Sequence, residues 1–218
     1  MFRKVAFVFV KVLVRVLTVS LGLGWAGCES PAAETMISSN LPAQAIRAAT
    51  PAGFISFCLR FADQCIVHSD EPSRIILDTR NWQALQSVNR AVNDGIWHET
   101  DQAHYGRAEY WTIPTDGYGD CDDYALTKRK RLQDIGFPAA ALRLAVVYSP
   151  QSQLHAVLTV ATDKGDFVLD NLKEDIRPWA ATRYDWIEVQ DAKNPMLWDR
   201  VGGLFYAMSE GGVTGSSK

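Results

Sequence analysis

The sequence predicts an α+β domain in which N-terminal helices pack on one face of an antiparallel sheet formed by the second half of the chain. Helical spacing of apolar residues ends near residue 135, and from residue 142 the pattern changes to extended runs rich in valine, leucine and aromatic residues. Helices followed by strands are typical of this class. A chain of 218 residues, 47% hydrophobic and 22% charged, fits one globular domain with an appendage.

The N-terminus has the pattern of a secretory signal peptide, which we place at residues 1–27. A basic leader precedes an uncharged run at residues 16–26, which is shorter than the roughly 20 residues that span a bilayer as a helix. An uncleaved anchor over residues 5–26 is the less favoured alternative. Lipidation at Cys28 is also less favoured, because Trp25 is a poor start for a lipoprotein cleavage box. The mature protein is therefore expected in the periplasm or outside the cell.

The rest of the chain divides into three parts. Residues 28–52, rich in alanine, serine and proline, are expected to form a tether, residues 53–208 the folded domain, and residues 209–218 a flexible tail. Removal of the leader takes away four basic residues and no acidic one, so the net charge changes from -3 to -7. Because the chain has no lysine-rich or arginine-rich domain that could follow a phosphate backbone, nucleic acid is not expected as a partner.

A first long helix is predicted from an N-cap at Asp78 and Thr79 to about Trp97. The buried stripe of this helix, at three-and-four spacing, consists of Trp82, Leu85, Val88, Val92 and Ile96. Asn89 and Asn93 lie one turn apart. We interpret them as surface residues, with support of a neighbouring group as the alternative.

A second helix is predicted from about Cys121 to Ile135, ended by a glycine C-cap and a proline. Its buried positions are expected to be Ala125, Leu132 and Ile135. The basic run at residues 128–131 is interpreted as a solvated face, because positive charge near a helix C-terminus complements the macrodipole. Residues 98–119, which lie between the two helices, have little periodicity and are expected to form a long functional loop.

Extended patterns predict the sheet. The strands are expected at residues 142–148, 154–162 and 166–170, with further candidates at 184–189 and 197–206. Asp163-Lys164-Gly165 has the composition of a tight turn, so the second and third strands should form a hairpin.

The four cysteines predict one disulfide and one free thiol. Cys28 lies at the processing site, Cys58 and Cys65 are expected to pair, and Cys121 is left over. The spacing of Cys58 and Cys65 is not the CxxC form of structural zinc sites, which argues against such a site. Because an unpaired thiol is a liability in an oxidising compartment, the retention of Cys121 suggests a function.

Cys121 is the candidate nucleophile. It lies in the first turn of the second helix, after an approach that contains Gly117 and Gly119. The free N–H groups and the positive end of the helix dipole favour thiolate, which lowers the pKa of a cysteine below its free value of about 8.5. The same N–H groups can hold an oxyanion, and the glycines leave room for a substrate carbonyl.

His155 is the candidate base, because it interrupts an apolar strand where an imidazole needs a polar partner. With an even-numbered hairpin loop, paired residue numbers sum to 327, so His155 faces Leu172 and Asp170 becomes its diagonal neighbour on the same face. Asp170 would then orient the imidazole, and Asn171 is the alternative. A three-residue loop would place the two side chains on opposite faces of the sheet.

Three acidic residues flank the nucleophile, and their charge raises the pKa of a neighbouring thiol. Asp123 is expected to cap the helix or to support the fold. Asp120 and Asp122 are candidate ligands of a hard cation such as calcium, whose charge would reverse this effect. Alternatively, all three residues serve only as partners of the helix dipole.

Several motifs around these residues carry a family resemblance. They are Tyr110-Trp111, Pro114, Gly119-Asp120-Cys121-Asp122-Asp123-Tyr124-Ala125, His155-Ala156-Val157-Leu158 and Asp166-Phe167-Val168-Leu169-Asp170-Asn171. Over about residues 54–205 the chain resembles the bacterial transglutaminase-like cysteine peptidases. The resemblance implies a papain-like core of the transglutaminase type, with Cys121 as nucleophile, His155 as base and Asp170 as the residue that orients it.

The resemblance also implies a cofactor and partners. The best understood members of the family are periplasmic proteases that cut large surface adhesins and bind calcium beside the nucleophile. An adhesin substrate, a calcium ion and a membrane receptor that sequesters the protease are therefore expectations for this chain, and no organic cofactor is expected. The family motif commonly reads Asp-Cys-Glu-Asp, and Asp122 replaces its glutamate here.

The function that the residues and the resemblance favour is that of an exported cysteine endopeptidase that works through a thioester acyl-enzyme. Two other hypotheses stay open. One is a protein transglutaminase or amidase that uses the same acyl-enzyme, and the other is a non-catalytic binding module of the same fold.

Overall fold

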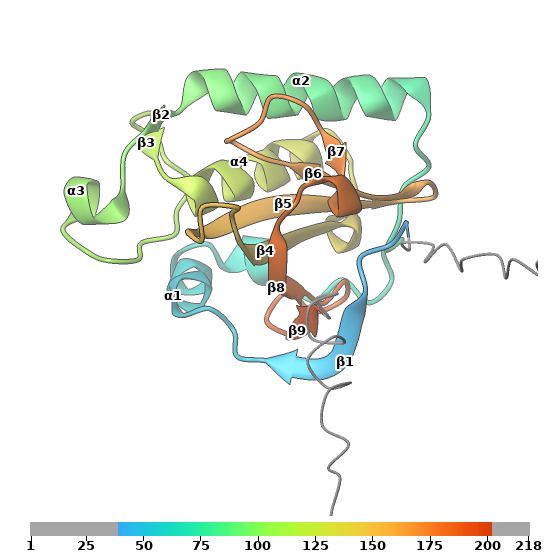
Figure 1. Ribbon diagram of the computed structural model, residues 1–218, viewed down its shortest axis with the longest axis horizontal. Coiled ribbons are helices and arrows are strands. Elements are labelled where there is room, and N and C mark those ends of the chain that lie inside the picture. The colour runs from blue at the N-terminus through green and yellow to red at the C-terminus, as the bar shows by residue number, and fades with distance from the viewer. Residues whose placement is uncertain (1–38, 202–218) are drawn as a thin grey trace, which may run out of the picture. The chain divides into compact units, whose positions relative to one another are not determined.

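The computed structural model describes residues 39–201, which form a seven-stranded antiparallel sheet flanked by helices (Figure 1). The strand order is β1-β9-β8-β4-β5-β6-β7. The strands are β1 Ala43–Ala48, β4 Leu142–Tyr148, β5 Leu154–Thr162, β6 Gly165–Leu169, β7 Arg177–Pro178, β8 Asp185–Gln190 and β9 Trp198–Val201. A separate parallel pair consists of β2 Trp97–His98 and β3 Tyr118–Gly119. The predicted α+β class is confirmed.

Two long helices form successive layers on the sheet. The α-helices are α1 Ala52–Arg60, α2 Thr79–Gly95, α3 Asp101–Tyr105 and α4 Cys121–Asp134, and the 3-10 helices are η1 Ala62–Cys65, η2 Ala139–Ala141 and η3 Trp179–Ala181. Helix α4 packs on β4 and β5, and α2 packs on α4 (Figure 1). No helix in residues 39–201 is long and apolar enough to cross a membrane.

The central strands are buried on both faces of the sheet. Leu144 of β4 and Leu158 of β5 belong to the large core on the helical side, whereas their neighbours Ala145 and Val157 belong to a second core on the opposite face. Because successive side chains of a strand point to opposite faces, two buried faces produce the nearly continuous apolar runs seen in these strands. This double burial makes β5 a rigid support for any polar side chain that it carries.

Helix α2 forms where the periodicity predicts it. Its N-cap is Asp78, whose Oδ1 accepts a hydrogen bond of 2.7 Å from the backbone N–H of Asn81. Leu85 is completely buried in the main core, against which Trp82 packs partly buried, and Val92 is completely buried in a separate cluster with Ile96 and Tyr124. Apolar side chains at helical spacing therefore face the interior.

Helix α4 also lies where it is predicted, but more of its surface is buried than we expect. The interpretation of residues 128–131 as a solvated face is wrong for Lys128 and Arg129, which are 0% and 2% exposed. The helix has the sheet on one side and α2 on another, so a single apolar stripe does not describe it. Ile135 is predicted to be a buried position of the helix, and this prediction is wrong. The helix ends at Asp134, and Ile135 is 57% exposed.

The hairpin of β5 and β6 has the register that the sequence analysis requires. Leu158 pairs with Leu169, and Thr162 pairs with Gly165 across a two-residue loop, so the paired numbers sum to 327. Gly165 has a φ of +110°, and a Cβ built there would lie 2.4 Å from the carbonyl oxygen of Ser39. Only glycine fits that position without strain.

The sheet begins earlier in the chain than we expect. Residues 43–48, part of the predicted tether, form β1 and pair with β9 at the sheet edge. An alanine-rich edge strand has too weak an alternation to be found from its sequence. The predicted signal peptide, Cys28 and the tail at 209–218 lie outside the described residues, as does the end of the last strand candidate after residue 201.

Candidate active site

Cys121 is the first residue of α4, and a short sheet fixes the chain that leads to it. Strand β3 ends at Gly119 and pairs with β2, and Asp120 follows as the N-cap. The backbone N–H of Asp120 donates to Oδ2 of Asp123 at 3.3 Å. A Cβ at Gly119 would lie 2.6 Å from that same oxygen. Glycine is therefore needed here so that Asp123 can fold back over the start of the helix.

The thiol of Cys121 is the free cysteine among residues 39–201 and is partly buried. Its sulfur accepts hydrogen bonds from the backbone N–H groups of Ala156 and Asp122. Burial raises the pKa of the Cys121 thiol, the charge of Asp122 raises it further, and the two N–H groups only partly offset these effects. The expected lowering of this pKa by the helix N-terminus is therefore outweighed, and the group rests as a thiol.

His155 and Asp170 form the pair that the hairpin register predicts. His155 lies on β5 and Asp170 directly follows β6, and both side chains are buried. His155 Nε2 lies 2.9 Å from Asp170 Oδ1. If Nε2 carries the proton for this bond, Nδ1 is the basic nitrogen. Since Ala156 contacts the Cys121 sulfur, β5 brings the imidazole and the thiol to the same end of the sheet.

Three further groups hold Asp170. The Tyr184 hydroxyl donates to Oδ2, the Leu172 N–H donates to Oδ1 at 3.0 Å, and Asn93 Nδ2 donates to the Asp170 carbonyl oxygen at 3.0 Å. Burial acts to raise the pKa of Asp170, but the hydrogen bonds from His155 and the other donors outweigh it, and the pKa is lowered. The carboxylate is therefore anionic and fixed in orientation.

The surface interpretation of Asn89 and Asn93 is wrong, and the alternative role as supports is right. Asn89 is completely buried and donates to the Glu174 carbonyl oxygen at 3.0 Å, one helical turn from the bond that Asn93 makes. Both asparagines adjoin the apolar stripe of α2, and this position is the signal that could have identified them. No pattern in the sequence around Tyr184 indicates that its hydroxyl contacts Asp170. The alternative orienting residue, Asn171, makes no bond with the imidazole, which contacts Asp170 instead.

A cluster of carboxylates lies beside the nucleophile. Single oxygens of Asp101, Glu109 and Asp122 lie within 4.8 Å of one another, and so do oxygens of Asp101, Asp120 and Asp123. Burial and then the charge of Asp120 raise the pKa of Asp122. Asp101 and Glu109 come from the predicted long loop, and no spacing in the sequence connects them with the helix start.

Burial is the largest effect on two further carboxylates of this cluster. It raises the pKa of Asp101 to about 6 and that of Asp123 to about 8, and the charge of Asp120 acts in the same direction on both. Asp123 accepts a hydrogen bond of 2.7 Å from the Thr112 N–H, besides the bond from Asp120. The expected structural role of Asp123 therefore fits the geometry.

The donor set of this cluster suits a hard cation. Asp101 Oδ1, Asp120 Oδ1 and Asp122 Oδ2 are buried without a hydrogen-bond partner. Buried carboxylate oxygens without donors are unfavourable unless a positive charge neutralises them. Carboxylates are the ligands that calcium prefers. These residues therefore fit a calcium ion, and Asp101 joins the two predicted ligands, Asp120 and Asp122.

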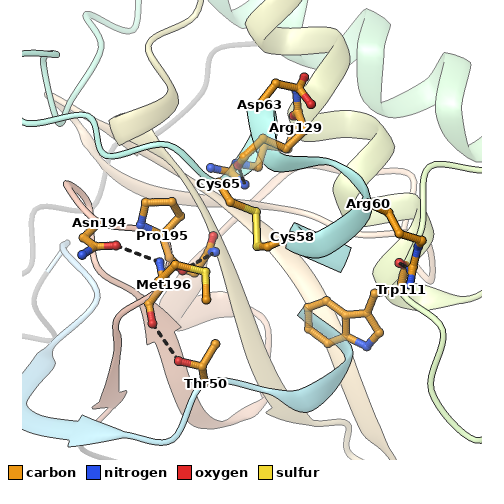
Figure 2. Close-up of a disulfide and its surroundings, with 12 residues drawn as sticks. Thr50, Cys58, Arg60, Asp63, Cys65, Trp111, Arg129, Asn194, Pro195 and Met196 are labelled. Atoms are coloured by element: carbon orange, nitrogen blue, oxygen red, sulfur yellow. Dashed lines mark hydrogen bonds between the residues drawn. A yellow bond between two sulfur atoms is a disulfide. The ribbon is translucent and has the colours of Figure 1, made fainter. Parts of the chain in front are cut away.

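The predicted disulfide is present. Cys58 of α1 and Cys65 of η1 are joined, with their Cα atoms 5.7 Å apart (Figure 2). Arg129 of α4 lies beside this bridge and donates to the Gln64 carbonyl oxygen at 3.2 Å. The bridge therefore fixes the end of α1 close to the helix that carries the candidate nucleophile.

Comparison with known proteins gave matches to one family and to solved structures. The family described as bacterial transglutaminase-like cysteine proteinase BTLCP matches residues 44–204. Structures of LapG from Legionella pneumophila, including a calcium-bound and an EGTA-treated form, are 27% identical to this chain. They cover 57 to 58% of this chain and 72 to 73% of LapG, with a TM-score of 0.48. No curated protein matches.

Proposed function

The chain belongs to the bacterial transglutaminase-like cysteine proteinase family, and from this premise we propose that it cleaves peptide bonds with Cys121 as nucleophile, His155 as general base and Asp170 as the residue that orients the base. The observation that carries the proposal is the buried bond of 2.9 Å between His155 Nε2 and Asp170 Oδ1. It lies next to the backbone N–H of Ala156 that contacts the Cys121 sulfur. Nucleophile, base and orienting group are the three roles of such a site.

The proposed reaction begins with proton transfer from the Cys121 thiol to Nδ1 of His155 as the sulfur attacks the peptide carbonyl carbon. Backbone N–H groups of the first turn of α4 hold the resulting oxyanion. His155 then gives its proton to the leaving amine, and the C–N bond breaks to leave a thioester. Water, deprotonated by His155, attacks the thioester, and the released thiolate regains the proton. Asp170 stabilises the imidazolium throughout.

Asp101, Asp120 and Asp122, with Glu109 beside them, are the residues that would hold a calcium ion. When bound, the ion supplies positive charge next to Cys121 and so favours the thiolate. The shorter Asp122 in place of the family's glutamate is compatible with this role, since its Oδ2 already lies among the other carboxylates without a donor.

The substrate that we propose is a protein on the cell surface, with an adhesin as the specific candidate from the family resemblance. The proposed compartment is the periplasm or the exterior, which the Cys58–Cys65 disulfide supports, because disulfides persist in oxidising compartments. A membrane receptor that sequesters the protease is part of the same proposal.

The test is to incubate the mature protein with cell-surface extracts and to sequence the new N-termini. New termini should form with the wild-type protein and not with Cys121→Ala. Ammonia release with isopeptide bonds would instead indicate a transglutaminase. Equal product from Cys121→Ala and wild type would contradict the enzymatic proposal, and no product from either protein would favour a binding module.

A further inference from the structure

Lys128 is buried at a position where the fold alone does not require a charge. It lies on α4, about two turns after Cys121, and is 0% exposed. Its Nζ has no hydrogen-bond partner, and the nearby Tyr124 ring centroid lies 6.0 Å away. A buried ammonium without a partner is strongly unfavourable, whereas a methionine of similar length would pack there without that penalty. The sequence therefore keeps an unfavourable group in the middle of its central helix.

The groups around Lys128 relate it to the catalytic carboxylate. Among residues 39–201, the charge that acts on its ammonium is that of Asp170, which follows β6. From α2, which packs on α4, the neutral amide of Asn93 donates to the Asp170 carbonyl oxygen. His155 and Tyr184 are both hydrogen-bonded to the carboxylate of Asp170. Asn93 thus holds the backbone of Asp170, whereas Lys128 interacts with the charge of the Asp170 carboxylate.

We propose that Lys128 is a positioning residue whose buried ammonium balances the Asp170 carboxylate, so that the His155 imidazole stays neutral and able to accept the Cys121 proton. The inference rests on the proposed function. Lys128 and Asp170 are both buried, one as a cation and the other as an anion, and the charge of Asp170 acts on the Lys128 ammonium. Without the lysine, the uncompensated carboxylate would hold a proton on the imidazole to higher pH.

The electrostatics of Lys128 agree with this arrangement. Burial lowers the pKa of Lys128 to about 7, and Asp170 acts in the opposite direction. The charge of the Asp170 carboxylate therefore helps to keep Lys128 protonated. The two asparagines of α2 carry side-chain oxygens that are buried without a partner, so this layer is polar.

The first test needs no substrate. NMR of the Cys121→Ala protein should follow the imidazole signal of His155 as the pH is changed. The signal that is missing in a His155→Gln variant identifies this residue. Adding Lys128→Met should move the titration midpoint upward by about one pH unit, whereas Lys128→Arg, which keeps the charge, should restore it. Lys130→Met is the matched control, because Lys130 is on the same helix but pairs with Asp134 at the surface. An unchanged midpoint in Lys128→Met would overturn the inference.

The second test separates this role from a structural one. Lys128→Met should raise the melting temperature, while the acidic limb of its kcat/KM profile moves upward by about one pH unit and activity at pH 6 falls roughly tenfold. A Lys128→Met protein that melts earlier or fails to fold would show that the lysine is structural, and the inference would be wrong. If wild type has no Cys121-dependent activity, the proposed function fails, whereas the NMR titration still decides the role of Lys128.

Discussion

Tyr184→Phe isolates the hydrogen bond that holds Oδ2 of the Asp170 carboxylate. The substitution keeps the ring, whose centroid lies 5.8 Å from that of His155, and removes the hydroxyl that donates to Asp170 Oδ2. Oδ1 keeps its donors, His155 and Leu172. Because a hydrogen bond to a charged group contributes about 1.5–3 kcal/mol, the free energy of unfolding at pH 7 should fall by about that amount.

The pH dependence of this loss has a definite sign. The pKa of Asp170 is lowered in the folded state, so its carboxylate stabilises the protein above the unfolded pKa of 3.8, and this stabilisation disappears as the pH falls through the folded pKa. Tyr184→Phe removes one of the donors that lower this pKa, so the difference in the free energy of unfolding from wild type should be full at pH 7 and shrink below about pH 4. Urea unfolding at several pH values measures it.

Tyr148→Phe is the control, because Tyr148 is an exposed tyrosine on β4. It should change the free energy of unfolding by less than about 0.5 kcal/mol. If Tyr184→Phe were as stable as Tyr148→Phe at pH 7, the assignment of its hydroxyl to Asp170 would be refuted.

Three further predictions concern the cation cluster, the buried lysine and the disulfide. Chelation should lower wild-type activity and Asp122→Ala should mimic it, whereas full activity in chelator would remove the metal from the proposal. Lys128→Met should stabilise the protein most below pH 7 and progressively less toward pH 10. The reason is that the pKa of Lys128 is lowered to about 7 in the folded state, so the protonated lysine destabilises the fold. A pH-independent difference in thermal unfolding between the variant and wild type would contradict this. The Cys58→Ser/Cys65→Ser double variant should lose about 2 kcal/mol, as expected for a bridge between residues seven apart, and an unchanged urea midpoint would contradict it.

The elements that the sequence predicts well are those with local physical signals. Helix α2 has an apolar period and an N-cap, and the β5–β6 hairpin has turn residues and a parity rule that places Asp170 beside His155. Strand β1 has no such signal, because its alternation is weak and its stability comes from a partner strand about 150 residues later in the chain.

The site residues that sequence reasoning missed depend on tertiary packing. Asp101 approaches Asp120 and Asp122 only because the long loop folds back on the start of α4. Burial of Lys128 follows from the position of α4 between α2 and the sheet, which no property of the basic run itself indicates. Tyr184 reaches Asp170 from the segment before β8. Such contacts become visible only when the layers of the fold are assembled.

The rate at which iodoacetamide alkylates Cys121 tests most directly whether its sulfur is activated by the imidazole. At saturating calcium and pH 7, intact-mass spectrometry should show rapid alkylation of the wild-type protein at this one cysteine. His155→Ala should slow the reaction by roughly tenfold or more, because the thiol then loses its proton acceptor. Equal rates in both proteins would mean that the sulfur and the imidazole do not act together.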